Sequence, residues 1–217
     1  MGQKALHLTW PERYGIDNFI HADCNALAFD VIAHLEKWKT NNLLLQGPEF
    51  SGKTHLAHIF KDKHDALLID TKEGLQSRPV HNVIVIDSID KLMTENPELA
   101  EDLFHLVNAA TLGQKFILMT MRDTPSQWVK LPDLLSRLNA SQKIEINEPN
   151  ETMVKSAYQK LFLDRGLMVE DKVLDYLAIR SERSFAGIRH NIDTLDALSL
   201  ETARKITIPL IKEANLF

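Results

Sequence analysis

The sequence predicts an α/β protein in which a five-stranded parallel sheet is flanked by helices and followed by a smaller, all-helical domain. Continuous apolar runs, such as residues 83–86, are typical of strands buried on both faces of a parallel sheet. Residues 47–54, GPEFSGKT, fit the phosphate-binding pattern G-x-x-x-x-G-K-[ST], with an apolar run before them and a helical pattern after them. After Pro149, strand patterns give way to helical periodicity.

Each element of the α/β part has its own signal. Apolar or alternating runs predict strands at residues 43–46, 67–70, 83–87, 115–121 and 143–146, the last with the alternation of an edge strand. Helical spacing predicts helices at residues 26–38, 55–60, 96–113 and 131–138. The third of these begins at an Asn-Pro pair and ends at a glycine, whereas residues 71–81 are predicted to be a polar connection.

The predicted domain boundary lies near Glu148. We expect an N-terminal arm at residues 1–20, a nucleotide-binding α/β domain at 21–148 and a helical lid at 149–217. The lid is expected to hold four helices, with Asn150 capping the first, Gly166 ending it and Ser184 beginning the third.

Residues 47–54 carry the chemistry of a nucleotide site. Glycines allow backbone conformations that a Cβ would block, so the N–H groups of the loop can face a phosphate at the start of a helix. Lys53 would place its charge on the β- and γ-phosphates, and the Thr54 hydroxyl would ligate Mg²⁺. The expected nucleotide-binding residues are Gly47, Pro48, Glu49, Phe50, Ser51, Gly52, Lys53, Thr54 and His55. A chance match is the alternative, and the order of strand, loop and helix argues against it.

Asp87 is the expected acidic partner of that loop. It ends the strand at 83–87, and open α/β sheets bind ligands at the carboxyl ends of their strands. Beside a phosphate-binding loop, such an acid orients Mg²⁺ through the water shell of the ion. A turn acid without a function is the alternative. We therefore expect Thr54 and Asp87 to form a Mg²⁺ site.

The composition excludes several classes of protein. The chain has 217 residues, of which 44% are hydrophobic and 25% charged, as is typical of soluble globular proteins. No apolar run approaches a membrane span, and no signal peptide opens the sequence. A net charge of −5 argues against a surface built for non-specific DNA binding. The single cysteine, Cys24, fits a reducing cytosol.

Several segments resemble one family. An α/β core with a small helical lid resembles the AAA+ class. Residues 103–108 (LFHLVN) and 116–120 (FILMT) resemble the approach to sensor 1 and sensor 1 itself in the replication initiator DnaA. Residues 131–138 (LPDLLSRL) resemble the box VII helix of Hda proteins, and residues 207–213 (TIPLIKE) resemble their C-terminal segment. The resemblance to the Hda/DnaA-like AAA+ family covers nearly the whole chain.

This resemblance implies a regulator of chromosomal replication initiation. Such a regulator stimulates ATP hydrolysis by DnaA while it is bound to the β sliding clamp of DNA polymerase III, in the bacterial cytoplasm at the nucleoid or replisome. Its own cofactor would be ADP or ATP with Mg²⁺. Because the helix-turn-helix domain that follows the lid in DnaA is not found before Phe217, we expect a regulator rather than an initiator, without sequence-specific DNA binding.

The resemblance also implies roles for single residues. Arg137 matches the arginine finger, which acts on a nucleotide bound by a neighbouring subunit and contributes about 10³–10⁵ in rate in the best-studied nucleotidases. Arg189 matches sensor 2 of the lid, and Thr120 lies at sensor 1. A solvated surface charge is the alternative for both arginines.

The N-terminal segment resembles a clamp-binding motif. In residues 3–8, QKALHL, Gln3 would add a hydrogen bond while Leu6 and Leu8 dock in a groove of the sliding clamp. Lys4 replaces the usual apolar second residue, which leaves the strength of this contact open. Apolar residues of an arm that pack on their own domain are the alternative.

Two departures from the family pattern predict slow intrinsic hydrolysis. Ser88 follows Asp87 where active AAA+ ATPases carry a second acid, and a serine hydroxyl is a poor base near neutral pH. Met121 follows Thr120 and offers no polar group to a γ-phosphate. Both departures favour a nucleotide, ADP in particular, that is held as a structural ligand.

Two other functions stay open at this point. One is a self-acting AAA+ motor or a helicase loader of the DnaC type, which robust ATP turnover by the isolated chain would favour. The other is a DnaA-binding adaptor that stimulates no hydrolysis. The sequence also leaves open which nucleotide is resident and whether the chain forms a homo-oligomer.

Overall fold

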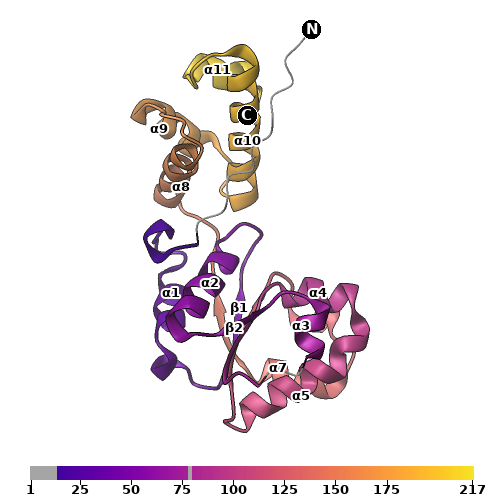
Figure 1. Cartoon of the computed structure of the whole chain (residues 1–217). Helices are drawn as coiled ribbons and strands as arrows, with labels where there is room; N and C mark the ends of the chain where they lie inside the picture. Colours follow the sequence, from indigo (N-terminus) through magenta and orange to yellow (C-terminus); the bar gives the residue numbers. More distant parts are fainter. Residues whose placement is uncertain (1–13, 78–79) are drawn as a thin grey trace. The chain divides into compact units, whose positions relative to one another are not determined.

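The computed structural model describes residues 14–77 and 80–217. Residues 14–147 and residues 148–217 form two compact units (Figure 1). None of the helices in the described part of the chain is long and apolar enough to cross a membrane.

Five parallel strands form the sheet of residues 14–147, which confirms the predicted fold class. Their order across the sheet is β2-β3-β4-β1-β5, so β5 is the edge strand that its alternation predicts. All five carboxyl ends therefore meet at one edge of the sheet. The strands are β1 (Asn42–Gln46), β2 (Leu67–Ile69), β3 (Val83–Ile86), β4 (Phe116–Met121) and β5 (Gln142–Glu145).

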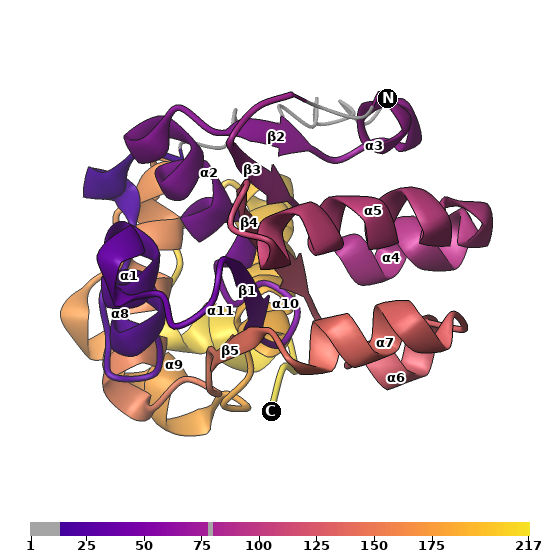
Figure 2. The same ribbon diagram turned by 90° about the horizontal axis from the view of Figure 1, so that it is seen from below.

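Helices cover both faces of this sheet, as continuous apolar strands require (Figure 2). On one face lie α1 (Ala26–Ala33) and α2 (Lys53–His64). On the other lie α3 (Lys72–Gln76), α4 (Ile89–Glu95), α5 (Ala100–Thr111), α6 (Pro125–Trp128) and α7 (Pro132–Asn139). Short 3₁₀ turns occur at η1 (Ile16–Asn18), η2 (Leu35–Lys37) and η3 (Pro97–Leu99).

Helical periodicity correctly identifies the buried face of α5. The apolar residues at its helical spacing, Leu103, Leu106 and Ala110, are buried against the sheet together with Leu134 and Leu138 of α7. This shared core fixes α7, the helix that carries Arg137, to the sheet.

Two predicted segments differ from the structure. The helix expected at 26–38 ends at Ala33, because the chain turns so that Trp38 can stack on Phe60 and donate its indole N–H to the carbonyl of Val31. The connection expected at 71–81 contains α3, whose Thr71 hydroxyl accepts the N–H of Gly74. Helices as short as α3, α4 and α6 show too few turns for periodicity to reveal them.

Residues 148–217 contain only helices among their regular elements: α8 (Glu151–Asp164), α9 (Asp171–Arg180), α10 (Phe185–Thr202) and α11 (Ile208–Glu213). The predicted caps are present, because Asn150 and Ser184 accept backbone N–H groups from the first turns of α8 and α10. Inside the unit, the Tyr158 hydroxyl hydrogen-bonds the Ser181 hydroxyl at 2.5 Å and accepts the Asn191 amide at 2.8 Å.

Candidate nucleotide-binding site

The phosphate-binding loop favours glycine at both of its fixed glycine positions, for different reasons. β1 leads into Gly47, whose N–H donates to the carbonyl of Met121 at 3.3 Å. A Cβ on Gly47 would lie 2.8 Å from the Ser51 hydroxyl and 3.0 Å from Cβ of Ile146. Gly52 has φ +91°, a left-handed conformation that favours glycine. The loop therefore curls tightly enough for its N–H groups to surround an anion.

Two residues inside the loop are energetically unfavourable, one in its backbone and one in its side chain. Phe50 has φ 62°, which is uncommon for a residue with a large side chain, and its ring is exposed. The Ser51 hydroxyl is buried and has no hydrogen-bond partner among the described residues. A buried polar group without a partner is unfavourable by about 1–3 kcal/mol. A phosphate oxygen in this loop would satisfy it, so the residues present fit a nucleotide.

Lys53 begins α2, and its side chain is partly buried. Its Nζ donates to the carbonyls of Gly47 at 2.9 Å and Pro48 at 2.7 Å. Burial lowers the pKa of Lys53 below its ordinary value. Nearby carboxylates oppose this fall in the pKa of Lys53, and they belong to Asp90, Asp87 and Glu49. The amine thus lies in an acidic environment at the mouth of the loop.

The structure brings Thr54, Asp87 and Thr120 together. The Thr54 hydroxyl donates to one oxygen of Asp87 at 2.9 Å, and the Thr120 hydroxyl donates to the other at 2.5 Å. Hydroxyl and carboxylate oxygens are the hard ligands that Mg²⁺ prefers, and this ion usually keeps several waters and binds substrate phosphates. No group of three or more His, Cys, Asp or Glu side chains that could hold a metal ion occurs in residues 14–77 and 80–217. Thr54 and Asp87 therefore fit a Mg²⁺ that takes its other ligands from nucleotide and water.

Thr120 has no free hydrogen-bonding direction toward a phosphate in this arrangement. It is fully buried, and while its hydroxyl donates to Asp87 it also accepts the N–H of Ser88 at 2.8 Å. A γ-phosphate contact by Thr120 stays a prediction. In this structure the Thr120 hydroxyl positions the carboxylate of Asp87.

Asp90 is a site residue that sequence reasoning missed. Its carboxylate is buried, and one oxygen accepts the N–H of Arg122 at 2.8 Å and that of Asp123 at 2.9 Å. Asp90 thereby fixes the turn that follows β4, beside the loop. Asp90 belongs to the first turn of α4, and an acid there would have been a usable signal had this short helix been predicted.

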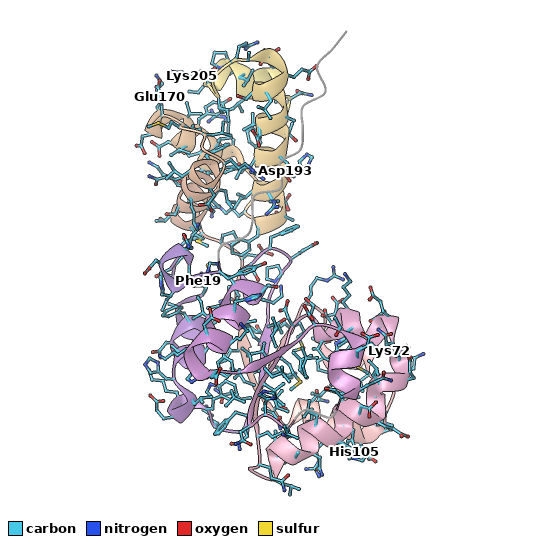
Figure 3. All side chains as sticks on the ribbon, viewed as in Figure 1. Phe19, Lys72, His105, Glu170, Asp193 and Lys205 are labelled. Carbon is cyan, nitrogen blue, oxygen red and sulfur yellow. The ribbon has the colours of Figure 1, made fainter. Side chains whose placement is uncertain are left out.

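The segment that includes Tyr14 and Phe19 packs on the start of α2, which the sequence did not reveal. The ring of Tyr14 stacks on His58 at 4.1 Å, and Phe19 (labelled in Figure 3) packs edge-on against His55. The Nε2 of His55 lies 2.9 Å from the Gly15 carbonyl, so the imidazole belongs to this packing. His55 would then contact a nucleotide through its backbone only.

Arg137 lies in the last turn of α7, on the exposed face of the helix. Leu134 and Leu138 lie on the opposite face of α7 and are fully buried. The Ser141 hydroxyl donates to the Arg137 carbonyl at 3.0 Å. In the part of the chain that the structure describes, no ion pair holds its guanidinium.

The sheet separates Arg137 from the phosphate-binding loop of the same chain. β5 begins at Gln142, which pairs with Leu43, whereas Gly47 follows the other end of β1. Four residues of strand span about 13 Å. Because α7 leads into the start of β5, Arg137 lies toward the amino ends of the strands and the loop lies at their carboxyl ends.

Arg189 is held within the lid. Its Nε lies 3.7 Å from a carboxylate oxygen of Asp193, which also pairs with Arg165. Asp193 stands one turn further along α10 (Figure 3). Contact of Arg189 with a nucleotide stays a prediction, as does clamp binding by Gln3, Leu6 and Leu8, which lie outside the described residues.

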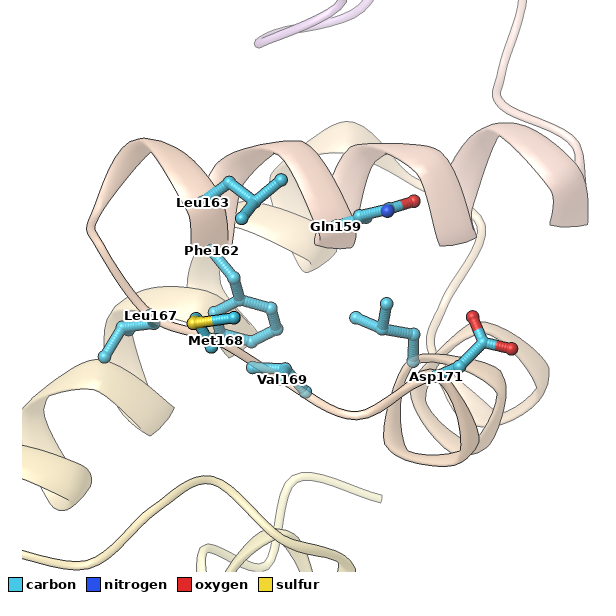
Figure 4. A pocket seen from close by; sticks show the side chains of 8 residues that line it. Gln159, Phe162, Leu163, Leu167, Met168, Val169 and Asp171 are labelled. Atoms are coloured by element: carbon cyan, nitrogen blue, oxygen red, sulfur yellow. The ribbon is translucent and has the colours of Figure 1, made fainter.

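A hollow of about 250 Å³ lies in the lid between α8 and the start of α9 (Figure 4). Apolar side chains such as Phe162, Leu163 and Met168 form most of its lining. None of the predicted site residues lines it, so it belongs to a different part of the surface from the nucleotide chemistry.

Comparison with known proteins identifies the lid and the fold. Residues 154–214 match the family described as "Hda, lid domain". Over 93% of this chain, the structure is similar to domain III of the Thermotoga maritima replication initiation protein DnaA, with a TM-score of 0.74, 17% identity and 95% of that chain covered. It is also similar to AMPPCP-bound DnaA from Aquifex aeolicus, with a TM-score of 0.68, 18% identity and coverage of 88% of this chain and 68% of that one.

Two sequence relatives extend over nearly the whole chain. An uncharacterized protein of Haemophilus influenzae is 26% identical over 214 residues, which cover 91% of each protein. The chromosomal replication initiator protein DnaA of Borreliella burgdorferi is 24% identical over 237 residues and 95% of this chain. The chain spans about half of that initiator, 49% of its length.

Proposed function

Since this chain is Hda/DnaA-like in its AAA+ fold and carries an Hda-type lid, we propose that it acts in the control of chromosomal replication initiation. It binds a nucleotide in its own loop and stimulates ATP hydrolysis by DnaA through Arg137, while attached to the β sliding clamp in the bacterial cytoplasm.

The assembled loop supports the nucleotide part of this proposal. Phosphates would be held by the N–H groups of residues 47–54 and by Lys53, and Mg²⁺ by Thr54 and Asp87. When bound, such a nucleotide supplies the negative charge that this site is built to neutralise. Solved DnaA structures bound to AMPPCP share the fold. Ser88 stands where a second acid would polarise water, which supports slow turnover here.

The position of Arg137 is the observation that carries the proposal. Arg137 lies toward the amino ends of the strands and therefore cannot reach a phosphate in its own loop, which lies at their carboxyl ends. It can instead enter the nucleotide site of a neighbouring protein. The buried face of α7 holds the helix against the sheet, so the guanidinium is presented from a rigid element. An arginine supplied in trans stabilises the charge that develops on a departing γ-phosphate.

The assay measures ATP hydrolysis by the cognate DnaA in the presence of clamp loaded on DNA. Wild-type chain should accelerate hydrolysis, and Arg137→Ala should remove the acceleration. Lys143→Ala is the matched control, because this exposed cation lies on β5, the strand that follows α7, and should retain full stimulation.

A second arm of the same assay tests the clamp contact. Gln3→Ala combined with Leu6→Ala should abolish stimulation on loaded clamp and clamp pull-down together. Pull-down that is unchanged by this double substitution would refute the assignment of the motif. Equal stimulation by wild type and Arg137→Ala would refute the arginine finger.

One alternative has an observation in its favour. Lys53, Thr54 and Asp87 are assembled within this chain, as a self-acting AAA+ ATPase or helicase loader would need. Robust ATP turnover by the isolated chain would support that alternative. Binding to DnaA without any stimulation would instead support an adaptor.

A further inference from the structure

The lid hollow, between α8 and the start of α9, presents apolar side chains to solvent (Figure 4). Met168 is 88% exposed and Leu163 is 56% exposed, and the buried ring of Phe162 lies in the same lining. Apolar side chains gathered at one exposed place are typical of a contact surface. The hollow has a volume of about 250 Å³, whereas a cavity of about 150 Å³ already takes benzene. At least one leucine or aromatic side chain therefore fits in it.

The rim of the lid hollow carries an excess of negative charge. The Nζ of Lys155 lies 3.0 Å from a carboxylate oxygen of Asp171 and 2.5 Å from one of Asp175. One ammonium group thus faces two carboxylates, and Asp171 is part of the lining. Complementary charge contributes to the choice of partner. A segment that fills this hollow should therefore combine apolar side chains with positive charge.

Residues 1–13 of the same chain have the apolar side chains that such a segment needs. These residues lie outside the described part of the structure. In the sequence, Leu6, Leu8 and Trp10 stand at every second position. Every second side chain of an extended segment points to the same face, so these three would form one apolar face.

The charge and the length of residues 1–13 also suit the lid hollow. Two cations, Lys4 and Arg13, stand against one acid, Glu12, so the segment is positive where the rim is negative. From Leu6 to Tyr14, where the described residues begin, an extended chain spans at most about 28 Å. The apolar residues can therefore act at a surface well away from Tyr14.

We propose that residues 6–10 dock in the lid hollow of their own chain, with their apolar face against Phe162 and Met168. This inference rests on the proposed clamp contact, because Leu6 and Leu8 are the leucines that would enter the clamp. The lid and the clamp then compete for one segment. Only molecules whose segment has left the lid bind the clamp, so the apparent affinity for the clamp falls with that fraction.

The ε-methyl resonance of Met168 reports docking in the absence of clamp. In full-length chain labelled with ¹³C-methyl methionine, it is the resonance that Met168→Leu removes. An indole ring beside the methyl group changes its chemical shift, so Trp10→Leu should move the resonance toward that of a solvent-exposed methionine. Leu200→Ala, at an exposed leucine of α10, is the control and should leave it in place.

Two results of this measurement overturn the proposal. One is a Met168 resonance that Trp10→Leu leaves unchanged. The other is a resonance whose position depends on the protein concentration, since a second copy would then supply the docked segment.

Clamp binding by the full-length chain tests the competition. Leu163→Ser combined with Met168→Ser removes the apolar contact and frees the segment, so the apparent dissociation constant for the clamp should fall about threefold to tenfold. Ile179→Ser is the matched control, because Ile179 is 65% exposed on α9 but does not line the hollow. Equal clamp affinity of wild type and the double variant overturns the competition.

The two readouts separate this inference from the proposed function. A chain that shows the Trp10-dependent shift but does not bind the clamp, even with Leu163→Ser and Met168→Ser, supports the docked segment and refutes the clamp contact. A chain that binds the clamp without showing this shift refutes the docked segment alone. Unfolding midpoints should match between wild type and the double variant, because both side chains are exposed.

Discussion

Asp87 depends on two hydroxyl groups from different elements. Thr54 comes from the first turn of α2, and Thr120 comes from β4. Each satisfies one oxygen of the carboxylate, so Asp87 points toward the start of α2, where Mg²⁺ chemistry would take place. The orientation of the Asp87 carboxylate therefore depends on α2 and β4 as well as on β3, which Asp87 follows.

Thr120→Val should show this dependence. Valine keeps the shape of threonine but leaves an Asp87 oxygen and the Ser88 N–H without their partner, which destabilises the fold by about 1–3 kcal/mol. Urea unfolding measures this loss. Thr120→Ser retains the hydroxyl and should recover most of the free energy of unfolding, whereas equal losses in both variants would point to packing instead.

His64 should make stability sensitive to acid. Burial lowers the pKa of His64 below its ordinary value, and its Nε2 is buried without a partner among the described residues. The folded state therefore binds a proton less readily than the unfolded state. The contribution of neutral His64 to the free energy of unfolding is fully present above the pKa of histidine in the unfolded chain, about 6.5. It is lost as the pH falls through the lowered pKa of His64 in the folded state.

His64→Gln removes this titration. Between pH 7.5 and pH 5.5, the free energy of unfolding should fall more for wild type than for His64→Gln, as measured by urea titration at each pH. His105→Gln, at an exposed position of α5 (Figure 3), is the control for replacing a histidine by glutamine. Parallel pH profiles for wild type and His64→Gln would contradict the assignment.

At the scale of secondary-structure elements, the sequence best predicts the strands and helices that have long apolar patterns. The strands and α5 have long apolar patterns, and each appears in the structure near its predicted bounds. α3 and α4 are too short for such patterns, so Asp90, in the first turn of α4, was missed. The contact of Phe19 with His55 depends on residues far apart in the chain, which no local pattern reveals.

The lid is held together by a polar network as well as by apolar packing. Tyr158 of α8, Asn191 of α10 and Ser181, which follows α9, meet in its interior. Burial raises the pKa of Tyr158, as expected for a phenol that stays neutral inside a protein. One network thus ties three helices of the lid to each other.

Tyr158→Phe should loosen the lid in particular. Removing the hydroxyl leaves the Ser181 hydroxyl and the Asn191 amide short of a partner, which destabilises by about 1–3 kcal/mol. Hydrogen exchange should report faster opening of α8 and α10 with little change in β1 and β4. Uniform acceleration across both units would contradict a network that acts within the lid.

At the scale of the whole molecule, the chain separates nucleotide binding from the arginine that we propose acts on a partner. Lys53, Thr54 and Asp87 lie at the carboxyl ends of the strands, and Arg137 lies toward the amino ends. The loop motif and the helix at 131–138 could be recognised in the sequence. The loop and this helix lie at opposite ends of the strands because of the strand order and register, which the sequence alone did not provide.

Single-turnover hydrolysis of labelled ATP, bound to DnaA before mixing, tests the central claim most directly. With loaded clamp present, wild-type chain should accelerate release of the labelled γ-phosphate. Arg137→Ala should return the rate to that of DnaA alone, and Lys53→Ala should retain the acceleration wherever it stays folded and clamp-bound. Undiminished acceleration by Arg137→Ala would contradict the account.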